Sequence, residues 1–196
     1  MNKLNTEYNH DYVDYMKYQK SKSLPSDFIV IDFETTGLSH KSCEIIQMAA
    51  IKYIEGEESE RFVTLVQPFR SISSTITRLT GITNEAVATA PLIDQVLPDF
   101  VQFLENHVII AHNASFDMKF LLHNAYYLGL DKPNNEVIDT VYLARKHMKD
   151  VRNHKLETLK TALGLSNMIS HRADTDCVVT AEVYKKCRDH HMAGIK

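Results

Sequence analysis

The chain has 196 residues, of which 44% are hydrophobic and 24% are charged. This length suits one domain with a full hydrophobic core, or a domain with a short extension, and the composition is ordinary for a globular protein. A formal net charge of −3 excludes the overall basic character of simple nucleic-acid binders, so bound cations would have to supply positive charge for a polyanionic substrate.

Cysteine usage and the first residues indicate the cellular compartment. The cysteines are odd in number and lack the spacing of a metal finger, which predicts reduced thiols. They are Cys43, Cys177 and Cys187. The polar start MNKLNTEYNHDY has no apolar signal segment, and no stretch is long and apolar enough to span a bilayer. We therefore expect a soluble, cytoplasmic protein with no membrane partner.

Residues 1–26 differ from the rest, and we predict that they form a helical extension and linker before a main domain at 27–196. Four tyrosines recur there at helical spacing: Tyr8, Tyr12, Tyr15 and Tyr18. They predict a helix that docks its tyrosines on the main domain, with an arm that binds a partner or stacks on bases as the alternative. The following KYQKSKSLPSD is expected to be a polar linker closed by Pro25.

The main domain is predicted to begin with three strands. The apolar, β-branched-rich run FIVIDF at 28–33 is typical of a strand buried in a sheet. Residues 44–68 predict two strands around a turn near Glu55–Glu58, with Gly56 at the bend and Pro68 ending the hairpin.

Helices alternate with two more strands in the remainder of the chain. We predict those strands at 108–113 and 136–140. The predicted helical segments are a short helix within 71–83 that ends at Gly81, a proline-interrupted stretch at 84–106, an amphipathic helix from Ser115 to near Gly129, and final helices at roughly 155–163 and 173–190. The strand at 136–140 leads into the segment VYLARKHM at 141–148. This order predicts an α/β fold, with a central mixed five-stranded sheet flanked by helices.

Two acidic residues interrupt the apolar first strand near its end. Asp32 and Glu34 are two residues apart, so their side chains point to the same side of the strand. Carboxylates that share a face repel each other unless a cation lies between them, and an unpaired buried carboxylate is costly. Mg²⁺ and Mn²⁺ prefer oxygen ligands of this kind and keep positions open for water and phosphate. The pair is a candidate metal platform.

Three further features distinguish this pair from solvated acids at a strand end. TTGL follows it directly, a polar exit that lets backbone N–H groups approach a ligand. AHNASFD places Asp117 just inside a helix, with His112 and Asn113 at the end of a buried strand. HRADTD places His171 before the last helix and Asp176 in its first turns. We expect these segments to face a common site, since ligand sites form at strand ends.

These motifs carry a family resemblance. The chain resembles the DEDD superfamily of 3′→5′ exonucleases, in the branch whose third motif contains histidine (DEDDh). DFETTGL at 32–38 matches the first motif, HNASFD at 112–117 the second, and His171 with Asp176 the third. The resemblance covers about residues 27–190. It is strongest to the epsilon proofreading subunit of bacterial DNA polymerase III and to proofreading domains built into bacterial replicative polymerases.

The resemblance implies a ribonuclease H-like fold and a two-metal phosphodiesterase that binds two divalent cations, Mg²⁺ or Mn²⁺. It implies that Asp32 bridges both ions, that Glu34 and Asp176 complete the tighter site, and that Asp117 holds the second ion. His171 would take the proton from the attacking water. The implied contacts to the 3′-terminal nucleotides of the substrate are made by Thr35, Thr36, Leu38, Asn113 and Phe116.

The implied activity is 3′→5′ hydrolysis at single-stranded DNA ends with release of nucleoside 5′-monophosphates, as in proofreading. Trimming of short RNA is the alternative within the same chemistry, because no residue can be shown to read or reject a 2′-hydroxyl. A non-catalytic module that binds nucleic acid or a polymerase is a third interpretation. It predicts erosion of the acids, but all four are present. A DNA polymerase subunit is the protein partner that the resemblance suggests.

Several polar residues near the motifs also have structural interpretations. Asp174 is an acid beyond the family pattern, and we expect it to be solvated at the start of the last helix. Asp139 is expected to make structural hydrogen bonds in preference to binding metal. The basic residues within 145–155 have two interpretations, a guide for a nucleic-acid backbone or a solvated face, and the sequence does not separate them.

Overall fold

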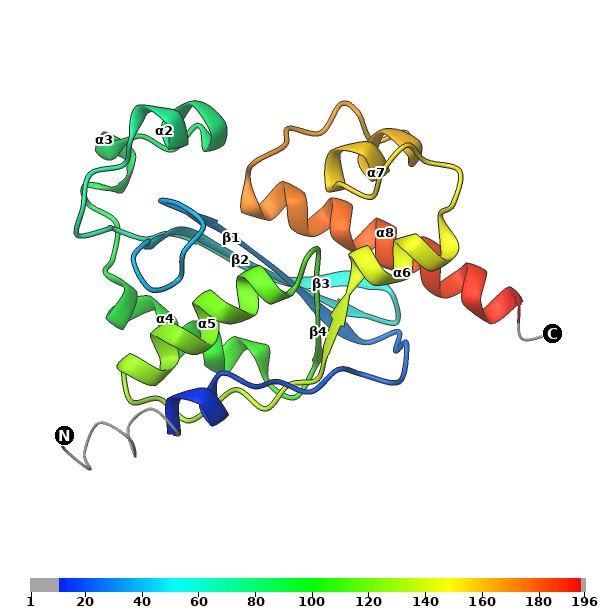
Figure 1. Cartoon of the computed structure of the whole chain (residues 1–196), viewed down its shortest axis with the longest axis horizontal. Coiled ribbons are helices and arrows are strands. Elements are labelled where there is room, and N and C mark those ends of the chain that lie inside the picture. The colour runs from blue at the N-terminus through cyan, green and yellow to red at the C-terminus, as the bar shows by residue number, and fades with distance from the viewer. Residues whose placement is uncertain (1–10, 195–196) are drawn as a thin grey trace.

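A mixed sheet of five strands forms the centre of the computed structural model, which describes residues 11–194 (Figure 1). The strands are β1 Phe28–Thr35, β2 Ile45–Ile54, β3 Glu57–Leu65, β4 Val108–Ala111 and β5 Val137–Asp139. Their order is β3-β2-β1-β4-β5, with antiparallel pairing from β3 to β1 and parallel pairing from β1 to β5. The predicted α/β fold with a mixed five-stranded sheet is confirmed.

Helices cover both faces of this sheet. They are α2 Ser74–Thr80, α3 Asn84–Val87, α4 Ile93–Leu104, α5 Ser115–Tyr127, α6 Thr140–His147, α7 Leu156–Ala162 and α8 Ala173–Ala193. One hydrophobic cluster packs α4 and α5 on the sheet, and a second packs α6, α7 and α8 on the opposite face. Because side chains alternate along β1, Ile29 and Ile31 join the first cluster, whereas Phe28 and Val30 join the second.

The hairpin between β2 and β3 turns where it is predicted to turn. Glu55 and Gly56 both have positive φ, 53° and 82°, which matches the tight hairpin turns that fit the twist of the flanking strands. Helix α2 likewise ends at Gly81 in the left-handed conformation (φ 74°), as predicted.

Two local predictions differ from the structure. The strand predicted at 108–113 ends at Ala111, because Asn113 adopts a left-handed conformation (φ 63°) that turns the chain into α5. Pro98 lies inside α4 and does not interrupt it. Both Pro98 and Asp94 are exposed, so water can bind the carbonyl of Asp94 that lacks a helical donor.

A short helix at 11–15 docks tyrosine side chains on the main domain, as predicted. The ring of Tyr12 lies edge-on to that of Tyr126 in α5, with centroids 5.0 Å apart. The hydroxyl of Tyr15 donates to a backbone carbonyl just after α5 (2.9 Å). Tyr8, the first tyrosine of the pattern, lies outside the described residues.

The polar segment that follows this helix is paired with the sheet. The N–H of Val137 donates to the carbonyl of Gln19 (2.8 Å), and the N–H of Ser21 donates to the carbonyl of Val137 (3.0 Å). Lys20 thereby forms a parallel bridge to β5. This pairing covers part of an edge strand whose backbone would otherwise be open to another chain. The domain boundary between residues 26 and 27 stays a prediction.

Candidate active site

Strand β1 presents two carboxylates at its C-terminal end. Asp32 and Glu34 continue the row of Phe28 and Val30, whose side chains are buried on the α8 face. Both acids are partly exposed, because this row leaves the core at the end of the strand. In the strand register Glu34 lies opposite Gln47 of β2, and the pairing becomes irregular directly after it. The two acids therefore lie at the edge of the core, where a ligand can reach them.

Asp117 comes to the same place from the first turn of α5. Its side chain is only 2% exposed, and its Oδ1 accepts a hydrogen bond from the N–H of Phe33, between the two acids of β1 (3.1 Å). The turn before α5 is fixed by Asp139, whose Oδ1 accepts from the N–H groups of Asn113 (3.2 Å) and Val141 (2.9 Å). These bonds confirm the structural role predicted for Asp139.

The loop before α8 and the start of that helix supply the third part of the site. Asp176 is 9% exposed, and its Oδ2 accepts a hydrogen bond from the backbone N–H of His171 (3.0 Å). His171 is exposed and has a φ of 59°, an uncommon conformation for a residue other than glycine. One ligand atom from each of Glu34, His171 and Asp176 lies within 4.8 Å of the other two. At that separation one cation can contact all three residues.

Burial raises the pKa of all four acids, and the charge of at least one other acid of the site adds to this for Asp32, Glu34 and Asp117. Burial, followed by the charge of Asp176, raises the pKa of Glu34 to about 7. Burial also raises the pKa of Asp176 to about 6 and that of Asp117 to about 8. The pKa of Asp32 is held well above its usual range by burial and by the charges of the other three acids. The four groups cannot all be ionised at neutral pH without positive charge among them.

The donor set fits divalent cations. The four acids offer carboxylate oxygens, which suit Mg²⁺ and Mn²⁺, and an imidazole stands beside them. The structure thus brings together every residue predicted to be catalytic, although these residues come from three separate parts of the chain. They are Asp32, Glu34, Asp117, His171 and Asp176.

Three of the residues predicted to contact substrate lie at the end of β1 and in the loop that follows it. The hydroxyl of Thr35 donates to the carbonyl of Gly37 (2.7 Å), and the Oγ1 of Thr36 accepts from the N–H of Glu44 (2.9 Å). These two side chains therefore hold the shape of the loop. Leu38 is 88% exposed on the same loop, an apolar side chain open to a ligand.

The other two predicted substrate contacts flank the helix start that carries Asp117. Asn113 is exposed in the turn before α5. Phe116 is partly buried, and its ring packs on that of Phe120 with centroids 5.0 Å apart. Contact with substrate stays a prediction for all five residues of this set.

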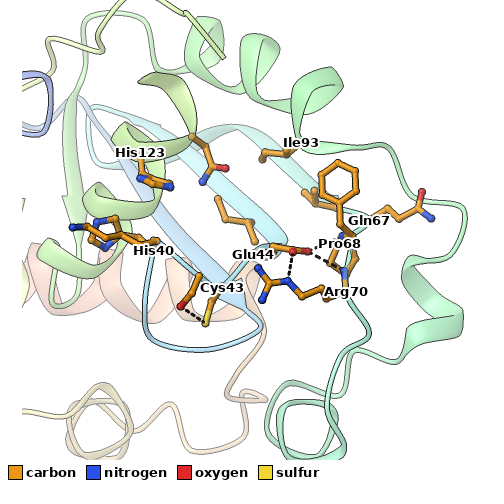
Figure 2. Close-up of a pocket in the computed structure, with 14 residues that line it drawn as sticks. His40, Cys43, Glu44, Gln67, Pro68, Arg70, Ile93 and His123 are labelled. Carbon is orange, nitrogen blue, oxygen red and sulfur yellow. Dashed lines mark hydrogen bonds and ion pairs between the residues drawn. The ribbon is translucent and has the colours of Figure 1, made fainter. Parts of the chain in front are cut away.

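A hollow of about 200 Å³ separates the loop after β1 from the segment after β3 (Figure 2). Glu44 joins these two segments: its Oε2 accepts from the N–H groups of Phe69 (2.6 Å) and Arg70 (3.3 Å), and its Oε1 lies 3.4 Å from the Nε of Arg70. Gly37 packs so closely on Cys43 that an added Cβ would lie 2.7 Å from the Sγ. Glu44 therefore positions the loop that presents Leu38.

Gln47 supports the site, and the sequence patterns above do not reveal it. Its side chain is 9% exposed, and its Oε1 accepts a hydrogen bond from the N–H of Ala173, the first residue of α8 (3.0 Å). This bond fixes the end of the helix that carries Asp176 next to β1. The available signal is a polar residue inside the apolar run IIQMAAI.

Comparison with known proteins decides the family. Residues 29–184, most of the chain, match the RNase T family of exonucleases. The chain belongs to this exonuclease family.

PolC-type DNA polymerases III contain a region similar to this exonuclease domain. The polymerase of Caldanaerobacter subterraneus subsp. tengcongensis is 42% identical over 168 residues, which cover 86% of this chain and 12% of the polymerase. The Bacillus subtilis polymerase is 40% identical over 173 residues, with 86% and 12% covered. The chain thus spans about 12% of the length of these relatives.

Solved exonuclease structures share the fold of this domain. Exonuclease X in complex with 5′ overhanging duplex DNA superimposes with a TM-score of 0.66 at 27% identity, covering 83% of this chain and 91% of that one. E. coli exonuclease I in complex with a dT13 oligonucleotide gives a TM-score of 0.75 at 19% identity, covering 87% and 43%. The predicted resemblance and the ribonuclease H-like exonuclease fold are confirmed.

Gln47→Leu should weaken both the fold and the activity of this exonuclease domain. The substitution leaves the buried N–H of Ala173 without an acceptor, which is expected to lower the free energy of unfolding by about 1–3 kcal/mol. Exonuclease activity should also fall, because the start of α8 is no longer fixed to the sheet. Urea denaturation and a nuclease assay measure the two effects, with the exposed Gln102→Leu in α4 as the matched control. Equal values for both variants would contradict the assignment.

Proposed function

We propose that this domain is a metal-dependent 3′→5′ exonuclease that hydrolyses phosphodiester bonds at the 3′ end of single-stranded DNA and releases nucleoside 5′-monophosphates. The observation that carries the proposal is the convergence of four carboxylates and His171 at the C-terminal end of β1. Membership of the exonuclease family supports it. The similarity to Exonuclease X, whose structure contains DNA, favours DNA over RNA as substrate.

The four carboxylates would hold two divalent cations, Mg²⁺ or Mn²⁺. The charges of the other three acids act on Asp32, which makes it the candidate to bridge both ions. Glu34 and Asp176, whose ligand atoms lie close together, would complete one site, and Asp117 would hold the second ion. When bound, the cations supply the positive charge that stabilises the attacking and leaving oxygens of the reacting phosphodiester.

His171 would accept the proton of the attacking water. Its backbone N–H is bonded to Asp176, which fixes the residue at the rim of the site, while its exposed side chain is open to substrate. An imidazole can accept a proton at neutral pH, as this step requires.

His171→Ala is expected to lower the turnover number about 10²–10⁴-fold, the usual contribution of a positioned general base. His190→Ala, an exposed histidine late in α8, is the matched control. A turnover number of the His171 variant equal to that of the control would overturn the assignment.

End-labelled degradation tests the proposed function as a whole. Matched single-stranded DNA and RNA are incubated with the protein and Mg²⁺, Mn²⁺ or EDTA. The expected result is a ladder that shortens from the 3′ end of DNA with either metal and is absent in EDTA. Faster degradation of RNA would replace proofreading with RNA trimming, and no degradation of either polymer would overturn the proposal.

A DNA polymerase is the proposed protein partner. In the PolC-type relatives the similar region is about 12% of a DNA polymerase, which places such a domain beside polymerase activity in those proteins. We propose that this domain acts in the cytoplasm on the 3′ ends that a polymerase extends. Within residues 11–194, no helix combines the length and apolar character needed to cross a membrane.

A further inference from the structure

A groove of about 680 Å³ lies beside the acidic site. It is lined by the extended segment before β1, by β5 and by α6. Ala114 and Ser115 also line it, and they lie at the start of α5, three and two residues before Asp117 in the sequence. One end of the groove is therefore next to the acidic site.

Four cationic side chains line this groove: Lys20, Lys22, Arg145 and Lys146. All four are exposed, and none forms an ion pair or a side-chain hydrogen bond within residues 11–194. Burial, and then the charge of Lys146 and of nearby histidines, lowers the pKa of His147 in the same lining. In a chain of net charge −3, the groove thus concentrates unbalanced positive charge.

An aromatic side chain stands among these cations. Tyr142 of α6 is 70% exposed and lines the groove, and Tyr18 lines it from the segment before β1. Single-stranded nucleic acid is bound by this combination, since cations contact phosphates and an aromatic ring stacks on a base of any identity.

Asp139 marks the junction between the groove and the acidic site. It is the one acid among the described residues of the lining, and it lies at the end of β5. Burial raises the pKa of both Asp117 and Tyr18, and the negative charge of Asp139 raises both pKa values further. One carboxylate is therefore close to a member of the acidic site and to a member of the groove.

We propose that this groove binds the single-stranded segment of nucleic acid that lies upstream of the 3′ end held at the acidic site. The inference rests on the proposed function and extends it to a second binding surface. Lys20 and Lys22 contact phosphates from one side, and Arg145 and Lys146 from the other. Tyr142 stacks on a base. The segment before β1, which pairs with β5, is therefore part of the substrate-binding surface.

Binding of a 5′-labelled DNA strand of about 16 nucleotides, measured in EDTA over a series of salt concentrations, tests the groove without cleavage. The variants are Lys20→Gln/Lys22→Gln and Arg145→Gln/Lys146→Gln. Each is expected to bind about tenfold more weakly at 0.1 M salt, with the salt slope reduced by about 1.4 for two lost phosphate contacts. Arg61→Gln/Lys185→Gln removes the same charge from β3 and α8, outside the lining, and should bind like the wild type.

Cleavage assays separate this inference from the proposed function. A dinucleotide reaches only the acidic site, so with Mg²⁺ or Mn²⁺ the groove variants should cleave it at the wild-type rate while the KM for the long strand rises. Groove variants that bind and cleave the long strand like the control would overturn the proposed binding role of the groove and leave the proposed nuclease function standing. A wild type that binds the strand through the groove but cleaves neither substrate would overturn the proposed nuclease function and leave the binding role of the groove standing.

Tyr142 tests the stacking contact independently of charge. Tyr142→Ala should weaken binding of the long strand at least about fivefold with an unchanged salt slope, whereas Tyr142→Phe keeps the ring and should bind like the wild type. Equal binding by both variants would show that the ring does not stack on the strand.

Discussion

Asp32→Asn is expected to reduce 3′→5′ degradation at least about 10³-fold, because it removes the carboxylate proposed to bridge both cations and each tenfold in rate corresponds to about 1.4 kcal/mol. The side chain keeps its size and loses its charge. Burial, and then the charges of three other acids, already raise the pKa of Asp32, so the variant removes a buried charge, relieves repulsion and should stay folded. End-labelled single-stranded DNA with Mg²⁺ or Mn²⁺ measures the loss.

Asp174→Asn is the matched control for this prediction. Asp174 lies in the same first turn of α8 as Asp176, and its Oδ1 lies 3.4 Å from the Nε of Arg172. The control removes one negative charge from the same end of α8 and should keep wild-type activity. Activity that survives Asp32→Asn, with its melting temperature unchanged, would mean that Asp32 does not hold a required cation.

Divalent cations should stabilise the protein strongly at alkaline pH and weakly at acidic pH. In EDTA the raised pKa values of the acids, about 6 for Asp176, 7 for Glu34 and 8 for Asp117, mean that the folded state binds more protons than the unfolded state between about pH 4 and pH 8. The free energy of unfolding therefore falls as the pH rises through this window. The metal-free protein should melt several degrees lower at pH 8.5 than at pH 5.5.

Cation binding should restore the free energy of unfolding that is lost at alkaline pH, since the bound ions neutralise the carboxylates that have lost their protons. At about 100 times the dissociation constant, binding contributes about 2.7 kcal/mol, which corresponds to roughly 5–10 °C in melting temperature for a chain of this size. At pH 5.5 the shift should be much smaller, because protons compete with the metal. Thermal scans with Mn²⁺ and EDTA at both pH values measure the difference.

Asp32→Asn/Asp117→Asn is the control variant for the thermal scans. Without two of the repelling carboxylates, it should melt higher than the wild type in EDTA at pH 8.5 and should lose the response to metal. A wild type whose melting temperature is the same with and without Mn²⁺ at pH 8.5 would exclude these acids as a cation site.

The sequence by itself determined the elements and the members of the candidate site. The apolar run FIVIDF predicts a buried strand, and the spacing of Asp32 and Glu34 predicts that the two acids share a face; the structure has both features in β1. The turn at Glu55–Gly56 and the helix end at Gly81 can be predicted because the backbone conformation there depends mainly on the residues of the turn itself. The acids and His171 could be selected as members of the candidate site because each lies in a short motif with a characteristic spacing between its residues.

Local pattern was not sufficient at two places. The strand predicted to continue through Asn113 stops at Ala111, because hydrogen bonding to Asp139 holds the next turn in a left-handed conformation. Pro98 stays within α4, because packing of the helix on the sheet outweighs one missing hydrogen bond on its exposed face. In both cases a tertiary contact overrides the local preference.

Only the tertiary structure decided which distant residues support and extend the site. The bond from Ala173 to Gln47 spans 126 residues, and the bond from Phe33 to Asp117 spans 84. The basic residues of α6 have two equal interpretations in the sequence, and their position across a groove from Lys20 and Lys22 is a fact of folding. Such pairs depend on strand register and on how helices pack. Sequence patterns report the periodicity of one local segment, so they cannot reveal contacts between residues that belong to distant segments.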